Sequence, residues 1–123
     1  MIEIARIRRC ISRDRFLKKV FGNKEYEELK SKRFCAQNAA ACFAAKEAFG
    51  KALGTGIRGF TLSEVEILHD DKGCPYFHLS GNAEKLCLER GLTVTLSITH
   101  TKEYAMAFVI AYKADLFSGG KQL

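Results

Sequence analysis

One segment, Cys42 to Gly56 (CFAAKEAFGKALGTG), constrains most strongly what this chain can fold into. At 3.6 residues per turn, its apolar residues fall on one helix face, namely Ala45, Ala48, Phe49 and Ala52. The opposite face carries Glu47 and Lys51, an acid and an amine one turn apart. The glycines that follow favour a positive φ and end the helix, which predicts accessible backbone N–H groups at Gly54, Thr55 and Gly56. This combination is typical of a site for a metal ion and a phosphate group.

The helix that contains this segment is predicted to span residues 36–53. Alanine dominates the run, loses no side-chain entropy in a helix and allows close packing. Further helices are predicted at three places: from Ala5 through Phe21, from Lys24 to Lys32, and from Ala83 to Arg90 with Asn82 as its cap.

The remaining segments predict strands. The sequence SEVEILHDDKGCPYFHLSG reads as two strands joined by a tight turn at Asp70 to Gly73. Residues 94–99 alternate apolar and polar side chains, whereas Tyr104 to Tyr112 is apolar almost throughout. We therefore expect Tyr104 to Tyr112 to be a central strand covered on both faces, joined to the preceding strand through His100 to Glu103.

The length and composition fit one domain. Of 123 residues, 47% are hydrophobic, so we expect a single domain over residues 1–113 and a flexible tail over 114–123. No apolar run is long enough to cross a bilayer, and the N-terminus is charged where a signal peptide is apolar. These features predict a cytoplasmic protein with no membrane partner. Five cysteines without C-x-x-C spacing predict reduced thiols rather than disulfides or zinc ligands.

The net charge of +6 is concentrated near the N-terminus. In the first predicted helix, Ile4, Ile7 and Ile11 form a stripe for burial, while a different face carries basic residues: Arg6, Arg9 and Arg13. Such a charge run is often only a solvated surface. The alternative is a docking surface for an anionic partner, which could be a nucleic acid, a membrane surface or an acidic protein.

Glu47 and Lys51 alone are compatible with a surface ion pair worth about 0.3 kcal/mol. A polyphosphate site is favoured by the glycine stop, by the basic residues before the long helix and by His100 between two threonines at a strand end. For those basic residues, Lys32 and Arg33, an ordinary basic loop is an equally good interpretation. Asp70 and Asp71 are better explained by the turn than by a metal, and His69 and His78 are interpreted as structural or surface residues.

Three stretches carry a family resemblance: FAAKEAFGKALGTG at 43–56, KGCPY at 72–76 and SITHTKEYA at 97–105. From Met1 to about Lys113 the chain resembles holo-[acyl-carrier-protein] synthases, the short bacterial 4′-phosphopantetheinyl transferases. The resemblance implies an α+β fold with an antiparallel sheet packed against a long central helix, assembled as a homotrimer with interfacial sites. It also implies Mg²⁺-dependent transfer of the phosphopantetheine arm of coenzyme A to a serine of acyl carrier protein, in fatty acid biosynthesis, releasing adenosine 3′,5′-bisphosphate.

The same resemblance implies residue roles. Glu47 would be the metal ligand, and Lys51 and His100 would hold the phosphates and stabilise the leaving group. Four residues would line the coenzyme A site: Gly54, Thr55, Pro75 and Thr101. Arg6 matches the arginine that contacts the carrier protein, with Arg9 and Arg13 on the same face.

The chain departs from the family at two places. Cys42 stands where the family has an arginine that helps hold the 3′-phosphate of coenzyme A, and Lys32, Arg33 or Lys46 could compensate. The family's metal-binding aspartate in the first strand would fall immediately before Met1. Glu3 is a poor substitute, because an odd offset along a strand points it to the other face. We therefore expect a longer native form, and weak Mg²⁺ binding through Glu47 with little transferase activity in the chain as given.

Two alternatives to a transferase remain open from the sequence. One is a small basic nucleic-acid-binding module, although the aromatic residues lie in apolar runs and no RNA-binding or helix-turn-helix signature occurs. The other is a scaffold that binds coenzyme A or the carrier protein without catalysis.

Overall fold

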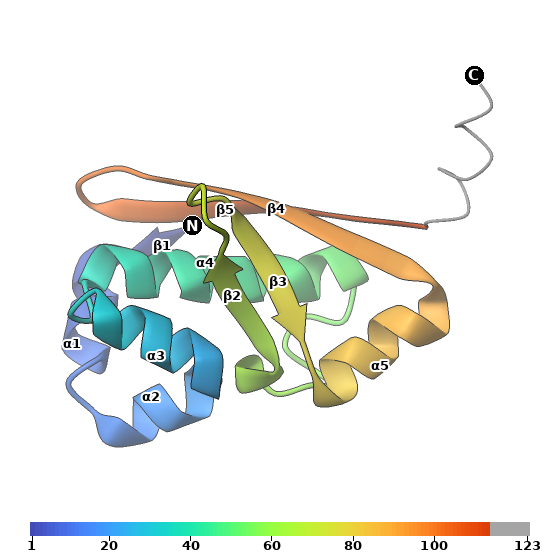
Figure 1. Ribbon diagram of the computed structural model, residues 1–123, viewed down its shortest axis with the longest axis horizontal. Helices are drawn as coiled ribbons and strands as arrows, with labels where there is room; N and C mark the ends of the chain where they lie inside the picture. Colours follow the sequence, from blue (N-terminus) through green and yellow to red (C-terminus); the bar gives the residue numbers. More distant parts are fainter. Residues whose placement is uncertain (114–123) are drawn as a thin grey trace.

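The computed structural model describes residues 1–113, so the predicted tail over 114–123 lies outside the described residues. The elements follow in the order β1 (Ile2–Glu3), α1 (Ile4–Cys10), α2 (Asp14–Val20), α3 (Asn23–Ser31), α4 (Ala36–Leu53), the 3₁₀ turn η1 (Leu62–Glu64), β2 (Val65–His69), β3 (Pro75–Leu79), α5 (Gly81–Arg90), β4 (Leu92–His100) and β5 (Tyr104–Lys113). Helix α4 runs through the middle, between the sheet that contains β5 and the helices α1 to α3 (Figure 1). The predicted α+β arrangement, an antiparallel sheet against a long helix, is confirmed.

Helix α4 has the predicted bounds and is buried around most of its circumference. Ala39, Ala40, Ala45 and Phe49 have no exposed surface, because elements pack against several sides of the helix. The predicted apolar face was only partly right, since Ala48 is half-buried and Ala52 is exposed.

The larger sheet has the strand order β1-β5-β4 and is antiparallel throughout. The central position of β5 is therefore confirmed, but its predicted coverage on both faces is wrong within this chain. One face packs on the core around α4, where Ala105 is buried. On the other face, Phe108 and Ile110 remain 63% and 64% exposed.

The smaller sheet is the predicted hairpin of β2 and β3, in a register that pairs Val65 with Leu79 and His69 with Pro75. The Oδ1 atom of Asp70 accepts the N–H groups of Lys72 and Cys74, both at 2.9 Å. The interpretation of this aspartate as a turn former is therefore confirmed.

The first predicted helix is two helices. Helix α1 ends at Cys10, the backbone of Arg13 is extended, and α2 begins at Asp14. The break turns the chain so that Leu17 and Val20 of α2 reach the same core as Ile4 and Ile7 of α1. Arg6 and Arg9 thus share one helix, and Arg13 lies outside it.

Helix α5 begins earlier than predicted. Ser80 is its N-cap residue, whereas Asn82 lies inside the first turn and donates its N–H to Oε2 of Glu64 at 3.0 Å. The helix ends at Gly91, with φ at +63°, as predicted. Among residues 1–113, no helix is both long enough and apolar enough for a membrane crossing.

A polar network crosses the core beneath α4. The ammonium group of Lys46 lies 2.7 Å from Oε1 of Glu25 and also donates to the carbonyl groups of Leu62 and Val65, at 2.9 and 2.5 Å. The other Glu25 oxygen, Oε2, accepts the N–H of Ile67 at 2.9 Å. The network joins α4 to α3 and to the start of β2.

Candidate functional site

A small hollow of about 190 Å³ lies between the N-terminal half of α4, the β2–β3 turn and the end of β4. Its lining includes Asn38 and Cys42 from α4, Pro75 from β3 and His100 from β4. Two predicted site residues that are distant in sequence, Pro75 and His100, therefore meet in one place. The hollow is the candidate functional site of the described chain.

His69 also lines this hollow. Its Nδ1 atom lies 2.9 Å from Oε2 of Glu28, and its backbone N–H donates to Oε1 of the same carboxylate at 3.0 Å. These hydrogen bonds fit the interpretation of His69 as a structural residue, and its position in the lining adds it to the candidate site. The hairpin register contained the missing signal, because His69 pairs directly with Pro75.

Cys42 occupies the wall of the hollow that α4 provides. Burial raises the pKa of this thiol well above its usual range, and the charge of Glu25 raises it further. Cys42 is therefore a neutral side chain here. All five cysteines are free among the described residues.

Glu47 and Lys51 lie further along α4 and do not line the hollow. Cys42 and Lys51 are nine positions apart, which corresponds to roughly 13 Å along a helix axis. Glu47 is half-buried and Lys51 is exposed, and within residues 1–113 they do not form the surface ion pair considered above. The predicted catalytic residues therefore divide into two groups in one chain.

The turn after α4 differs from the expectation in its hydrogen bonds. Gly54 and Gly56 have positive φ angles, of +77° and +62°, as predicted. However, the N–H groups of Thr55 and Gly56 both donate to the carbonyl of Gly50, and that of Gly54 donates to Lys51. These N–H groups close the end of the helix, so the prediction of free phosphate-binding N–H groups was wrong.

The three basic residues predicted to bind coenzyme A, Lys32, Arg33 and Lys46, lie in different environments. Lys32 and Arg33 are exposed just before α4, where Arg33 takes a left-handed backbone conformation with φ at +61°. Lys46 is fully buried and its ammonium group already donates to Glu25, Leu62 and Val65. We therefore remove Lys46 from the candidate coenzyme A ligands.

Thr101 lies in the turn between β4 and β5. Its Oγ1 atom accepts the N–H groups of Glu103 and Tyr104, at 3.3 and 3.1 Å. The hydroxyl oxygen thus stabilises the turn that follows His100.

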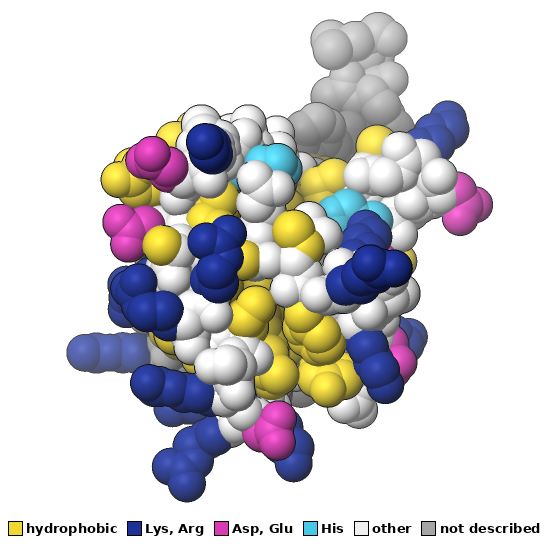
Figure 2. Space-filling view, turned by 90° about the vertical axis from the view of Figure 1, so that its left-hand side faces the viewer, with side chains coloured by type: hydrophobic (Ala, Val, Ile, Leu, Met, Phe, Trp, Pro, Cys, Tyr) yellow, Lys and Arg dark blue, Asp and Glu magenta, His cyan; other side chains and the backbone are white. Residues whose placement is uncertain are grey.

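The basic residues Arg6, Arg9 and Arg13 are all exposed. Figure 2 shows the face of the molecule where α1 lies, with Lys and Arg side chains arranged around a hydrophobic area. This surface combines positive charge with apolar contact area.

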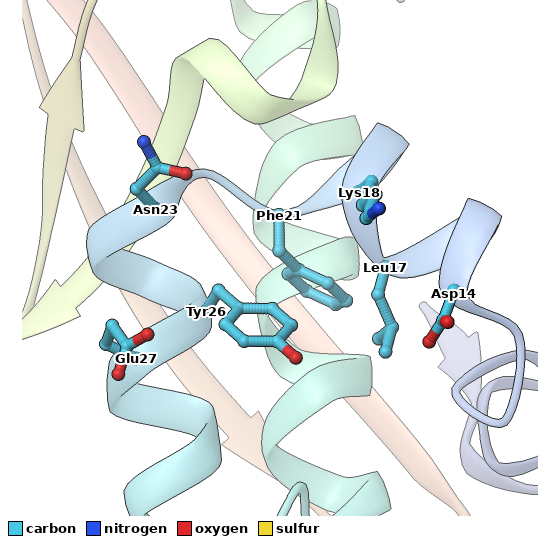
Figure 3. A pocket seen from close by; sticks show the side chains of 7 residues that line it. All are labelled: Asp14, Leu17, Lys18, Phe21, Asn23, Tyr26 and Glu27. Carbon is cyan, nitrogen blue, oxygen red and sulfur yellow. The ribbon is translucent and has the colours of Figure 1, made fainter.

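A larger hollow of about 500 Å³ lies between α2 and α3 (Figure 3). Leu17, Phe21 and Tyr26 point into it, and Asp14 and Glu27 stand at its edges. It contains none of the predicted site residues. Its size alone does not make it the functional site.

The residues present fit Mg²⁺ only in part. Among residues 1–113, no three His, Cys, Asp or Glu side chains come together as a metal site. Glu47 is a half-buried carboxylate without an ion pair to another described residue. Since Mg²⁺ commonly takes one or two carboxylates and completes its shell with phosphate oxygens and water, Glu47 is compatible with such a role.

Comparison with known proteins agrees with the sequence resemblance. The profile of the 4′-phosphopantetheinyl transferase superfamily matches residues 2–109. A holo-[acyl-carrier-protein] synthase of Thermoanaerobacter sp. (strain X514) is 41% identical over 113 residues, which cover 90% of this chain and 82% of that protein. One of Fusobacterium nucleatum is 38% identical and covers 89% of this chain and 92% of that protein.

Solved structures show the same fold. The holo-[acyl-carrier-protein] synthase of Neisseria meningitidis superposes with a TM-score of 0.84 at 34% identity, covering 91% of this chain and 93% of that chain. The Helicobacter pylori enzyme, solved in complex with coenzyme A, gives 0.78 at 29% identity, covering 90% and 95%. The resemblance inferred from the sequence motifs is confirmed: this chain belongs to the holo-[acyl-carrier-protein] synthase family of the 4′-phosphopantetheinyl transferase superfamily.

Proposed function

We propose that this chain transfers the 4′-phosphopantetheine arm of coenzyme A to a serine of apo acyl carrier protein, in the cytoplasm and for fatty acid biosynthesis. The observation that carries the proposal is the identity of about 40% over nine-tenths of the chain to proteins named for this reaction. In the transfer, the serine oxygen forms a bond to the phosphorus of the arm. The bond from that phosphorus to adenosine 3′,5′-bisphosphate breaks, and the serine proton is released.

Phosphoryl transfer depends mainly on positioning and on neutralising spread negative charge, so the residues proposed are those that hold phosphates. Lys51 and His100 would bind phosphate oxygens and stabilise the leaving group. Five residues would line coenzyme A: Gly54, Thr55, Gly56, Pro75 and Thr101. Lys32 and Arg33 would add positive charge just before the N-terminal end of α4.

Glu47 would hold a Mg²⁺ ion together with the phosphates of the substrate. The bound ion would supply positive charge to the pyrophosphate. The half-buried position of Glu47 on α4, one turn before Lys51, supports this role because the carboxylate has no competing ion pair among the described residues.

A homotrimer would bring the two groups of site residues together. Glu47 and Lys51 lie along α4, away from the hollow with Pro75 and His100. If one subunit contributes Glu47 and Lys51 and its neighbour contributes His100, both groups face one substrate. The exposed Phe108 and Ile110 of β5 support such an assembly, because large exposed apolar side chains on one sheet face are typical of an interface.

The acidic carrier protein would dock on Arg6 and Arg9 of α1, and the exposed Arg13, which the helix break removes from their shared face, would add positive charge before α2. Complementary charge on the rim of an interface chiefly accelerates association and is screened by salt. The exposure of all three arginines supports this assignment.

The direct test is transfer from coenzyme A to purified apo acyl carrier protein in the presence of Mg²⁺. We expect the carrier mass to rise by one phosphopantetheine group, but slowly, because Glu47 is the only carboxylate among residues 1–113 that we assign to Mg²⁺. Glu47→Gln is expected to lower the rate at least about a hundredfold. The variant would lose the carboxylate that holds Mg²⁺, and with it the positive charge that neutralises the phosphates. Glu84→Gln, an exposed carboxylate on α5, is the matched control. Binding of coenzyme A without any mass increase would favour the non-catalytic scaffold, and tight sequence-selective nucleic-acid binding would favour the third alternative.

A further inference from the structure

The hollow beside α4 differs from most phosphate-binding sites, because no lysine or arginine lines it. Its polar rings are two imidazoles, His69 at the end of β2 and His100 at the end of β4. Cys42, between them and the core, is held neutral by burial. The side chains available to bind an anion in this hollow are therefore the two histidines.

His69 is held in a fixed orientation by one carboxylate. Glu28 of α3 accepts the backbone N–H of His69 through Oε1 at 3.0 Å and lies 2.9 Å from Nδ1 through Oε2. Both side chains are partly exposed, at 28% and 26%. A carboxylate at this distance accepts a hydrogen bond from Nδ1–H, which leaves Nε2 as the ring atom available to a ligand. Within residues 1–113, Nε2 of His69 has no hydrogen-bond partner.

We propose that His69, oriented by Glu28, is a further ligand for a phosphate group of coenzyme A in this hollow. The inference rests on the proposed function, since coenzyme A supplies the phosphate. With Nδ1 bonded to Glu28, Nε2 is the ring nitrogen left to meet a phosphate oxygen, and an imidazole that carries both protons donates through it. The charged or titratable groups that face the ring are Glu28 from α3, Cys42 from α4, and His100 from β4.

The volume of the hollow limits which part of coenzyme A it can hold. About 190 Å³ accommodates a phosphate group but not a whole nucleotide cofactor. Coenzyme A offers two sources of phosphate, the pyrophosphate bridge and the 3′-phosphate of the ribose. Their shared chemistry fits the hollow equally, so dephospho-coenzyme A, which lacks the 3′-phosphate, distinguishes them.

His69→Gln removes the imidazole ring and keeps a polar side chain. We expect the Kd and KM for coenzyme A to rise about tenfold, which is the loss of one charge-assisted hydrogen bond, with an unchanged KM for the carrier protein. His78→Gln is the matched control, since His78 lies in the same hairpin on β3 and does not line the hollow. His69→Lys retains a positive charge and is expected to keep the affinity within about threefold.

Dephospho-coenzyme A then identifies the phosphate. If the affinity loss in His69→Gln disappears with this ligand, His69 holds the 3′-phosphate; if the loss persists, it holds the pyrophosphate. Equal affinity of wild type and His69→Gln for both ligands overturns the inference while leaving the proposed function intact. A wild-type chain that binds no coenzyme A overturns both.

Glu28 is a positioning residue, and its effect should pass through His69. Glu28→Ala is expected to raise the KM for coenzyme A severalfold with little change in kcat, whereas Glu27→Ala, an exposed neighbour, should not. In the His69→Gln background, Glu28→Ala should add nothing, because the two residues act on one contact. Additive losses in this double-mutant cycle would contradict the positioning role.

Discussion

The Nζ atom of Lys46 lies 2.7 Å from Oε1 of Glu25, and neither side chain has any exposed surface. Lys46 belongs to α4 and Glu25 to the first turn of α3, so the pair links two helices through an otherwise apolar core. The N–H of Glu25 in turn donates to Oε2 of Glu66 at 2.8 Å. Among the described residues that are not exposed, no buried side-chain nitrogen or oxygen lacks a hydrogen-bond partner.

Lys46→Met is expected to destabilise the fold strongly. Methionine fills a similar volume, but the carboxylate of Glu25 would remain buried without its cation. Breaking a buried ion pair in this way typically costs about 3–5 kcal/mol. Urea unfolding measures the loss, with Lys85→Met on the exposed face of α5 as a control expected to change stability by less than about 0.5 kcal/mol. Similar stabilities of the two variants would contradict the structural role of Lys46.

The destabilisation by Lys46→Met is also expected to depend on pH. Burial raises the pKa of Glu25, while the charge and hydrogen bond of Lys46 and the N–H groups of Ile67 and Gly22 lower it. Removing Lys46 removes two of the lowering causes, so the pKa of Glu25 rises further. In the folded variant Glu25 then holds a proton that the unfolded chain has already lost, and stability falls as pH rises from the ordinary carboxyl pKa to the raised one.

We therefore expect Lys46→Met to lose less stability at about pH 5 than at about pH 8, relative to wild type at each pH. In the double variant Lys46→Met, Glu25→Gln, this difference should disappear, because glutamine does not titrate. An equal loss at both pH values in the single variant would show that Glu25 is not the group responsible.

The sequence predicted the long helix and the β2–β3 hairpin because these elements depend on local residue patterns. The alanine run predicted the helix α4 and Gly54 its end, and the turn at Asp70 to Gly73 predicted the hairpin. The polar network was missed because Lys46 and Glu25 are 21 residues apart, and no local pattern links them. The break between α1 and α2 was missed for a similar reason, since packing of Leu17 and Val20 decides it.

The sequence also predicted only part of the candidate site, because local motifs identify single residues but not contacts between residues that are distant in sequence. Pro75 and His100 were found by motif, and their meeting in one hollow follows from the arrangement of strands. The partnership of His69 with Glu28 spans 41 residues and has no sequence pattern of its own. The free N–H groups predicted after α4 were wrong, because the last turn of the helix supplies its own acceptors.

Gly50 is expected to be the least replaceable glycine of the α4 segment. A Cβ atom at this position would overlap the carbonyl oxygen of Gly56, a backbone atom that the turn holds in place. Gly50→Ala should therefore cost about 2–3 kcal/mol despite the better helix propensity of alanine. Gly54→Ala is the comparison, since nothing lies within 4 Å of its Cβ and only its φ of +77° is unfavourable, at about 1 kcal/mol. A smaller loss in Gly50→Ala than in Gly54→Ala would show that the turn can shift away.

Arg6→Glu is expected to raise the KM for the carrier protein about tenfold and to leave the KM for coenzyme A unchanged. The reason is that Arg6 is exposed on α1, where it would meet the acidic carrier, while the coenzyme A residues lie elsewhere. The effect should shrink at high salt as the charges are screened. Lys85→Glu on α5 provides a control with the same change of charge. Equal effects of Arg6→Glu on both substrates would remove the docking assignment.

Phe108→Asp is expected to prevent the proposed trimer from assembling. Phe108 lies opposite Ser97 on the uncovered face of the larger sheet and is 63% exposed in the single chain. A charge buried without a partner in an apolar interface costs several kcal/mol, so sedimentation should detect monomers. Leu88→Asp is the control, because Leu88 is 75% exposed but lies on α5. A trimer that survives Phe108→Asp would place the interface elsewhere.

If the site is shared between subunits, two inactive variants should restore each other. His100→Ala retains Lys51, and Lys51→Ala retains His100, so a mixed trimer contains some interfaces at which both residues are intact. Random mixing in equal amounts gives about a quarter of such interfaces in a cyclic trimer. Transfer activity should therefore recover to about a quarter of the wild-type value after the variants are mixed and reassembled. No recovery from reassembled trimers would mean that Lys51 and His100 act within one chain, although His100 lines the hollow and Lys51 does not.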